Sequence, residues 1–509
     1  MKTNSLDFDA QVLREKILDL AMRGKLVKQD PNDEPASVLL EKIKAEKAEL
    51  VKEKKIKKSK PLPEITDDEK PFDIPDSWEW VRLGEIGSIV SGGTPKRSEK
   101  SYWDNANIPW ITPASMSATQ NEIVYKNNDL KFINKNGLEH SSAHLISANS
   151  VVVSSRAPIG YVNIVPFDYT TNQGCKSIVP YTDIENKYIY FVIKFVTPDM
   201  YKRASGTTFK EISGTRFGET VIPLPPLEEQ SRIAAKIAQL FALLRKVESS
   251  TQQYAKLQTL LKSKVLDLAM RGKLVKQDPH DEPASVLLEK IKVEKKQLIK
   301  EKKIKKSKPL PPISDEEKPF EIPDSWEWVR LGDIGAWAAG ATPSRKHPEY
   351  YGGTIPWLKT GDLNDGIVNE TSEKITELGV KNSSVKVNEP GNVLIAMYGA
   401  TIGKLGIVGN QELVTNQACC GCSLFDGVHN WYLFYYLLAS RKRLIDLGSG
   451  GAQPNISKNK IEKFTFPLPP LEEQSRIAAK VAQLFALLRK SEGFRFGYAR
   501  KIGQASFKR

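Results

Sequence analysis

The letters PLPPLEEQSRIAAK occupy residues 223–236 and return unchanged at 467–480. Three further stretches also recur unchanged, each 248 residues later. They are LDLAMRGKLVKQDP from 18–31, DEPASVLLEKIK from 33–44 and IPDSWEWVRLG from 74–84. The residues between Trp110 and Pro223 diverge strongly from their counterparts in the second half. Because solenoid repeats are far shorter, at about 20–50 residues, the chain is a tandem duplication with two near-identical frames around two dissimilar centres.

The frames and centres divide the chain into five segments. In order they are a frame at 1–75, a divergent domain at 76–222, a central frame at 223–323, a second divergent domain at 324–466 and a last frame at 467–509. Each divergent domain has β-type alternation with Gly, Thr and Asn turns, followed by one aromatic helix, at 187–196 or 431–438. We expect an α+β protein whose two centres are mixed α/β domains.

The central frame begins with a long helix. After Leu227 the apolar residues step by four and three as far as Leu268, interrupted only by Thr251 and Gln258, and this spacing is typical of a coiled-coil seam. Pro225 and Pro226 suit its first turn, and Gly272 suits its C-terminal end. About 45 residues at 1.5 Å each give a rod of about 65–70 Å, although an ordinary amphipathic helix on one domain remains an alternative.

The second copy of this helix is divided between the two ends of the chain. Its first half lies at 471–490, and its second half corresponds to the apolar series from Leu6 to Leu20. We therefore expect a circular repeat, in which the two ends rebuild a second rod antiparallel to the first in a pseudo-twofold coiled-coil spacer. The expected seam and partner-interface residues are Leu13, Ile17, Leu20, Ile233, Ile237, Leu240, Leu244, Ile477, Val481, Leu484 and Leu488.

The charge balance favours a polyanionic partner. The 75 Lys and Arg residues outnumber the 61 Asp and Glu residues, which gives a net charge of +14. Two Lys-rich tracts, at 52–60 and 300–308, are identical. A run of like charges is usually a solvated surface, so solvation and phosphate contact both remain open for these tracts.

The remaining composition predicts a cytoplasmic protein. No apolar stretch approaches the ~18 residues of a membrane-spanning helix. Asp7, Asp9, Arg14 and Glu15 stand where a signal peptide needs an apolar core. Four cysteines are too few for a disulfide framework in a chain of 509 residues.

The sequence lacks the motifs of common catalytic sites. We find no phosphate-binding loop, no nucleophile elbow and no zinc-binding helix. The Asn/Asp-Pro-Pro-aromatic signature of adenine methyltransferases is also missing. Cys419, Cys420 and Cys422 have no evident fourth ligand, so buried thiols are favoured over a metal site. We expect no catalytic residue and no metal in this chain, although scattered carboxylates leave a nuclease site open.

Four loops recur at matching places in both divergent domains. SGGTPK at 91–96 matches AGATPS at 339–344, and TNQ at 171–173 matches 415–417. The loop at 154–160 matches 396–403, and the loop at 205–213 matches 449–457. Their polar side chains suit base edges and phosphates. The candidate DNA contacts are Thr94, Lys96, Arg97, Arg156, Gln173, Lys176, Thr207, Thr208, Lys210, Thr342, Arg345, Lys346, Tyr398, Lys404, Gln417, Gln453 and Asn455.

The order of frames and centres, with paired LPPLEEQSRI motifs at 224–233 and 468–477, resembles the specificity subunit of type I restriction–modification enzymes. The resemblance covers nearly the whole chain. It implies that each centre is a target-recognition domain reading one half of a split site in double-stranded DNA. It also implies that the rods are a spacer on which two adenine-N6 methyltransferase subunits dock, with restriction subunits added.

The same resemblance places the catalytic residues in those partners, together with S-adenosylmethionine, ATP and Mg²⁺, and implies no cofactor in this chain. Three other interpretations remain. A self-sufficient DNA-modifying enzyme is disfavoured by the missing cofactor motif. Another kind of coiled-coil DNA-binding protein also remains possible. A coiled-coil protein whose end domains bind carbohydrate or protein is a further alternative, which the net charge of +14 disfavours.

Overall fold

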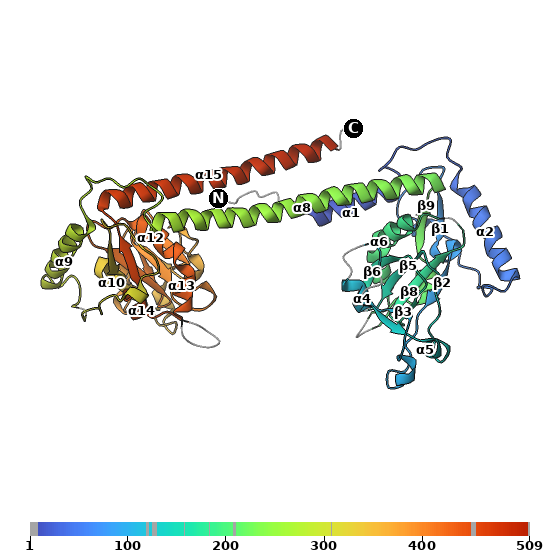
Figure 1. The fold of residues 1–509 in the computed structure, drawn as a ribbon, viewed down its shortest axis with the longest axis horizontal. Coiled ribbons are helices and arrows are strands. Elements are labelled where there is room, and N and C mark those ends of the chain that lie inside the picture. Colours follow the sequence, from blue (N-terminus) through green and yellow to red (C-terminus); the bar gives the residue numbers. More distant parts are fainter. Residues whose placement is uncertain are drawn as a thin grey trace. The chain divides into compact units, whose positions relative to one another are not determined.

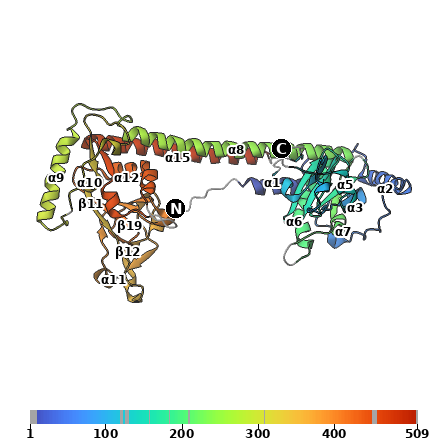
Figure 2. The ribbon, with the colours of Figure 1, turned by 60° about the horizontal axis from the view of Figure 1, so that its bottom comes forward.

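The computed structural model describes residues 9–118, 122–124, 130–156, 158–182, 184–206, 210–306, 308–448 and 455–506, with side chains as far as Lys490. The chain forms two compact units, Met1–Thr251 and Gln252–Arg509 (Figures 1 and 2). Both units mix helices with sheets, so the expected α+β class is confirmed. Among the described helices, none is long and apolar enough to cross a membrane.

The divergent centre of the first unit is built on a four-stranded antiparallel sheet of order β2-β8-β5-β6. Helix α6 (Asn186–Arg203) packs against β6 and β5, and it continues past Pro198 beyond the expected end at residue 196. A smaller sheet has the order β4-β3-β7. The strands are β2 Gly87–Ser91, β3 Ile108–Ile111, β4 Lys131–Ile133, β5 Ser150–Ser155, β6 Ile159–Val165, β7 Thr170–Thr171 and β8 Cys175–Pro180.

The second unit repeats this plan with longer sheets. Its two main sheets have the orders β11-β19-β16-β17-β13 and β14-β12-β18-β15, and its aromatic helix is α12 (Asn430–Ala439). The strands are β11 Gly335–Ala339, β12 Tyr351–Leu358, β13 Gly366–Val368, β14 Glu373–Ile375, β15 Val387–Asn388, β16 Val393–Ala396, β17 Leu405–Val408, β18 Leu413–Thr415 and β19 Cys419–Leu424. The short helices of both centres are α3 Leu83–Ile86, α4 Pro113–Ala118, α5 Lys135–Glu139, α7 Gly214–Gly218, α10 Leu331–Ile334, α11 Glu377–Lys381, α13 Arg441–Asp446 and α14 Lys458–Glu462.

Each divergent centre enters and leaves its frame through one two-stranded ribbon. In the first unit β1 (Glu79–Arg82) pairs antiparallel with β9 (Val221–Leu224). In the second unit β10 (Glu327–Arg330) pairs with β20 (Thr465–Leu468) in the same way. The chain therefore enters and leaves each divergent centre at adjacent points, so a whole centre is attached to its frame through this one ribbon.

The frame of the first unit pairs two helices. Helix α1 (Ala10–Met22) shares a buried core with the first half of α8 (Leu227–Met270). Arg14 lies 2.6 Å from Glu248, whereas Gln29, just after α1, bonds Glu229. Because the partner numbers fall as the chain advances, the two segments run antiparallel.

The frame of the second unit repeats this packing with other segments. The second half of α8 shares a core with the start of α15 (Leu471–Ser506). Gln258 Nε2 donates to the Leu488 carbonyl at 3.0 Å, and Gln277 donates to Glu473. By the repeat offset, α1 corresponds to the second half of α8, and the first half of α8 corresponds to α15. A shorter helix follows in each frame, α2 (Ala36–Lys52) or α9 (Ala284–Lys300).

The seam residues differ in burial. Ile233, Ile237, Ile477 and Val481 are fully buried, and Ile17 is 8% exposed. The other predicted seam residues are half-buried, namely Leu13, Leu20, Leu240, Leu244, Leu484 and Leu488. The tightest packing therefore lies where each helix meets its own divergent centre.

A glycine terminates helix α1 and helix α8, as expected for α8 from the sequence. Gly24 has φ +66° and Gly272 has φ +67°, which is the left-handed region that favours glycine. The next residue closes the turn, because Lys25 N donates to Leu20 O and Lys273 N donates to Leu268 O, each at 2.8 Å. This geometry explains why the glycine of AMRGK is kept in both copies.

A buried polar network joins three further stretches of the repeated frame. Glu229 at the start of α8 is 1% exposed and accepts hydrogen bonds from Trp78 Nε1 at 2.9 Å and from Gln29. Glu473 accepts from Trp326 and Gln277 in the same way. Burial raises the pKa of both carboxyls, although the donors oppose this shift. Since a buried carboxylate without its donors would be costly, the repeated LEEQ, SWEW and KQDP letters depend on one another.

A second buried group in each frame is an arginine. The side chains of Arg82 and Arg330 are 4% exposed, and each pairs with one glutamate and with backbone carbonyl oxygens. Arg330 Nη1 lies 2.6 Å from Glu317, and this hydrogen bond, followed by that from Ser314 N, lowers the pKa of Glu317 to about 2. The pKa of Glu69 beside Arg82 is also lowered.

These glutamates predict acid sensitivity. The pKa of Glu317 is about 2 when folded against an ordinary 4.5. Its contribution to the free energy of unfolding should therefore be complete above pH 4.5 and disappear as the pH falls toward 2. We expect Glu317→Gln to lower the midpoint of thermal unfolding at pH 7 and to lower it much less at pH 3. An equal loss at both pH values would contradict this assignment.

Candidate nucleic-acid interface

The first two of the four recurring loops lie against each other in both units. Gly93 N donates to Thr171 O at 2.8 Å, and Ala341 N donates to Thr415 O at 2.9 Å. The approach is close because Gly92 and Gly340 have no side chain. A Cβ on Gly92 would lie 2.2 Å from the Asn172 carbonyl oxygen. The contact between the loops at 91–96 and 171–173, and between those at 339–344 and 415–417, is thus built into the backbone, and the sequence alone did not predict it.

Aromatic side chains fix the first loop from below. Trp110 Nε1 donates to Gly93 O at 3.0 Å, and Trp103 Nε1 donates to Lys96 O at 3.3 Å. In the second unit the corresponding donors are Trp357 Nε1, to Ala341 O at 3.1 Å, and the Tyr351 hydroxyl, to Pro343 O. The stretch Ile-Pro-Trp occurs at 108–110 and again at 355–357. Its buried tryptophan, 2% exposed in both units, holds this loop.

The two loops join at the surface through one side-chain hydrogen bond. The Thr94 hydroxyl donates to Gln173 Oε1, and the Thr342 hydroxyl donates to Gln417 Oε1. Both glutamines are exposed. Four of the predicted DNA contacts therefore form two equivalent pairs.

The other two loops also meet in both units. Arg156 and Glu211 form an isolated β-bridge, as do Tyr398 and Asn455 at the matching positions. The bridges are continued by Ile212 N, which donates to Ser155 O at 3.0 Å, and by the matching bond from Ile456 N to Met397 O at 2.9 Å. The same loop contacts therefore occur in both units, but the side chains at the bridges differ between the units.

The charges of the first unit converge on Glu211, which sequence reasoning did not identify. Lys176 Nζ lies 3.6 Å from Glu211 and donates to the Gln173 carbonyl at 3.1 Å, and Arg156 lies 4.0 Å from Glu211. Lys176 is only 5% exposed, because its strand places it beneath the loops. It supports the turn that carries Gln173, whereas Arg156 is exposed.

The charges of the second unit are arranged differently. The Arg345 guanidinium lies 4.1 Å from the Tyr351 ring centroid and 2.8 Å from Glu373. Lys359 also bonds Glu373, at 2.7 Å, and this cation and Arg345 lower the pKa of that carboxyl. No motif pointed to Lys359 or Glu373, because strand pairing across β12 and β14 brings them together.

The remaining candidates vary in position. Lys210 is exposed with its amine 4.4 Å from the Tyr201 ring centroid, and Lys404 is half-buried. Lys96, Arg97, Lys346, Tyr398 and Asn455 are exposed. Thr207, Thr208 and Gln453 lie outside the described residues.

The cysteines do not gather into one site. Cys420 and Cys422 face the core beside α12, whereas Cys419 faces the opposite side of β19 in a separate cluster, as the alternation of a strand requires. All are buried and free, and burial raises the pKa of the Cys420 thiol to about 12. Within the described part of the chain, no group of three or more His, Cys, Asp or Glu could hold a metal ion.

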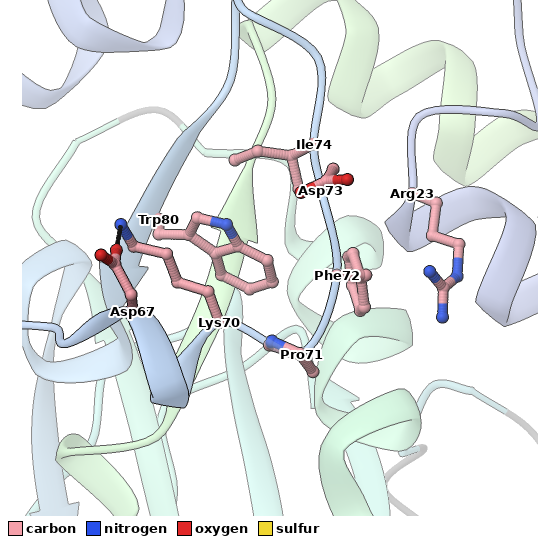
Figure 3. A pocket seen from close by; sticks show the side chains of 8 residues that line it. All are labelled: Arg23, Asp67, Lys70, Pro71, Phe72, Asp73, Ile74 and Trp80. Carbon is pink, nitrogen blue, oxygen red and sulfur yellow. Dashed lines mark hydrogen bonds and ion pairs between the residues drawn. The ribbon is translucent and has the colours of Figure 1, made fainter.

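A surface pocket of about 550 Å³ is lined by Arg23, by residues 67 and 70–74 and by Trp80 (Figure 3). Arg23 covers the Phe72 ring at 4.4 Å, and Trp80 lies 5.1 Å from Phe72. Lys70 and Asp67 form an ion pair at its edge. The second frame has the same arrangement of Arg271 and Phe320, so this hollow belongs to the repeated frame rather than to the divergent surface.

Comparison with known proteins now identifies the family. Residues 75–258 and 323–492, which include both sets of loops, match the family described as "Type I restriction modification DNA specificity domain". The chain belongs to this family. It is 34% identical to the specificity subunit of the Escherichia coli type I restriction enzyme EcoAI, over 94% of this chain and 89% of that subunit. It is 31% identical to the EcoEI specificity subunit from Escherichia coli, over 93% and 88%.

One solved structure shares the fold of this specificity subunit. It is described as "Structural basis underlying complex assembly and conformational transition of the type I R-M system", with a TM-score of 0.56 at 22% identity over 86% of this chain and 97% of that chain. The resemblance inferred from the repeated motifs is confirmed. As a type I specificity subunit, the chain recognises a DNA sequence and is not itself the catalytic component.

The loop glycines of this specificity subunit give a direct prediction. A Cβ on Gly340 would lie 2.1 Å from the Thr415 carbonyl oxygen, a backbone atom that cannot turn aside. We expect Gly340→Ala to separate the two loops, lower the free energy of unfolding by about 1–3 kcal/mol and weaken DNA binding about tenfold or more. Gly361→Ala is the matched control, because a Cβ there meets nothing within 4 Å. Equal DNA affinity of the two variants would contradict the role of this loop.

Proposed function

We propose that the two divergent domains, 76–222 and 324–466, are target-recognition domains that each read one half of a split site in double-stranded DNA. The main support is that the two domains share one loop arrangement but expose different side chains on it. Both domains assemble the same four loops, yet Arg156 stands where the other has Tyr398, and Glu211 stands where the other has Asn455. Two readers of one sequence would have no reason to differ at these positions.

The exposed loop side chains are the proposed contacts. Cations such as Lys96, Arg97 and Lys346 suit phosphates, whereas Gln173, Gln417 and Asn455 suit phosphates or base edges. The net charge of +14 supports such a surface. Lys176 is proposed to act by supporting Gln173, since its amine is already bonded and buried.

The proposal extends to the helix pairs of the frames. We take them as parts of one antiparallel coiled-coil spacer with a circular repeat, in which the N-terminal and C-terminal helices complete the second rod. Two methyltransferase subunits would dock on this spacer and restriction subunits would join them, supplying S-adenosylmethionine, ATP and Mg²⁺ sites. The support is the equal antiparallel order of the pairs, with Arg14 opposite Glu248 and Gln258 opposite Leu488.

The circular repeat can be tested by permutation. Joining the chain ends with a short linker and reopening the chain at Ser249–Thr251 should give a protein with the same DNA preference. Cysteines placed near positions 3 and 493, whose side chains lie outside the described residues, should crosslink in the folded protein. Failure to crosslink would contradict the circular arrangement.

The split site and its partners are tested together in cells. DNA methylation should be mapped at base resolution in cells with and without this gene. We expect gene-dependent methylation within one motif that has two specified blocks separated by unspecified base pairs. Gene-dependent methylation in an uninterrupted motif would contradict two separate readers.

The identical Lys-rich tracts supply a prediction about salt. Lys54 lies on the turn that follows α2, with φ +59°, and Lys57 and Lys58 come just after it; all three are exposed. Replacing these residues and Lys55 with Gln should make the dependence of log affinity on log salt less steep, by about 0.9 for each phosphate that is no longer neutralised. Lys44→Gln, on the exposed face of α2, is the control. An unchanged slope would assign the tract to solvation alone.

A further inference from the structure

The paired Thr and Gln at the loop tips are the same in both units, although much of the surrounding loop sequence differs. Thr94 bonds Gln173 in the first unit, and Thr342 bonds Gln417 in the second. Their neighbours in the loops differ, since Lys176 is replaced by Cys420 and the neighbouring bridge residues are also unlike. A pair shared by two readers of different sequences does not distinguish those sequences.

The pair is not required for the fold. The loop is already held from below by two aromatic donors and by the backbone bond from Gly93 N or Ala341 N. Gln173 and Gln417 are exposed, and an exposed side-chain hydrogen bond adds little to stability, because water replaces it when it breaks. The buried scaffold therefore serves to present the pair.

The hydrogen bond also determines what the pair presents. Gln Oε1 accepts from the threonine hydroxyl, so the two Nε2 hydrogens are oriented and are not used within the pair. Arg97, three residues after Thr94, is exposed and adds a cation to the first loop, whereas Arg345, at the matching position, pairs with Glu373 at 2.8 Å. Oriented N–H donors suit a phosphate oxygen, and such contacts fix register without reading bases.

We infer that Gln173 and Gln417, each oriented by its threonine, bind one backbone phosphate in each half-site and set affinity and register without selecting bases. The inference rests on the proposed function and assigns a task within it. The base preference then belongs to the side chains that differ, including those at the Arg156–Glu211 and Tyr398–Asn455 bridges.

The test uses the full chain, with its partner subunits, on the duplex it selects from randomised DNA. Gln173→Ala and Gln417→Ala should each weaken binding about 3- to 10-fold, as expected when one hydrogen bond is removed, with the selected sequence unchanged. Gln411→Ala is the matched control. Gln411 is also an exposed glutamine bonded within the second unit, to Asn369 O at 2.9 Å, at the opposite end of β18.

A scan of single methylphosphonates, which remove one phosphate charge each, identifies the atom bound. One methylphosphonate in the first half-site should weaken DNA binding by the parent chain but cause no further loss of binding by Gln173→Ala. One in the second half-site should likewise weaken binding by the parent chain but not by Gln417→Ala.

Three results would overturn the inference. Relaxed preference at one base pair would mean that the glutamine reads a base, unchanged affinity would mean that it touches no DNA, and additive losses at every phosphate would place the contact elsewhere. If the parent chain selects no split sequence, the proposed function itself fails, which is a separate outcome.

Discussion

Exchanging the residues between Arg82 and Val221 for those of another specificity subunit should replace one half of the recognised DNA site and leave the other half unchanged. The exchange is structurally simple, because Arg82 and Val221 are paired neighbours in the β1–β9 ribbon. The Trp78–Glu229 bond and the helix pair remain in the frame. The change in preference should be complete for that half-site, since all four loops are replaced.

The reciprocal exchange provides the control. Replacing the residues between Arg330 and Thr465, which pair in the β10–β20 ribbon, should alter only the other half-site. Both preferences are measured by sequencing duplexes selected from randomised DNA. A change in both half-sites after a single exchange would contradict independent recognition domains.

A charge in the helix seam should have the largest effect on stability. Ile237 and Val481 are fully buried at matching positions in the two units. An aspartate there would be buried without a partner, so Ile237→Asp or Val481→Asp should lower the free energy of unfolding by about 3–5 kcal/mol. We expect a fall of about 10 °C or more in the thermal midpoint and weaker binding of methyltransferase subunits.

Substitutions at exposed neighbouring positions of the same helices separate the cost of burying the aspartate from the cost of its low helix propensity. Ala235→Asp and Ala482→Asp place the same charge on the solvent side and should cost less than about 1 kcal/mol. Leu13→Asp and Leu484→Asp should fall between these extremes, because both leucines are half-buried. Equal losses at Val481 and Ala482 would show that the seam is not the packed surface.

The sequence predicted the frame well because its determinants are local or duplicated. The apolar series after Leu227 and the glycine at 272 predicted a helix that is observed at Leu227–Met270. The letters repeated in both halves proved to be mutually bonded groups, such as Trp78 with Glu229. The loops that recur despite divergence also proved to be adjacent, because each contains part of the scaffold that joins them.

The sequence was less informative where strand pairing decides the outcome. Glu373 reaches Arg345 and Lys359 only because β12 and β14 pair in one register. Lys176 was expected among the DNA contacts, yet its strand buries it beneath Gln173. These positions depend on contacts between residues far apart in the chain, which local patterns do not encode.

The base preference of the intact chain shows whether its two recognition domains read two half-sites. The full chain, assembled with its partner subunits, should be incubated with randomised duplex DNA, and the bound molecules should be sequenced. We expect two short specified blocks of different sequence, separated by a fixed number of unspecified base pairs. A single uninterrupted block, or no enrichment over the unbound DNA, would contradict this expectation.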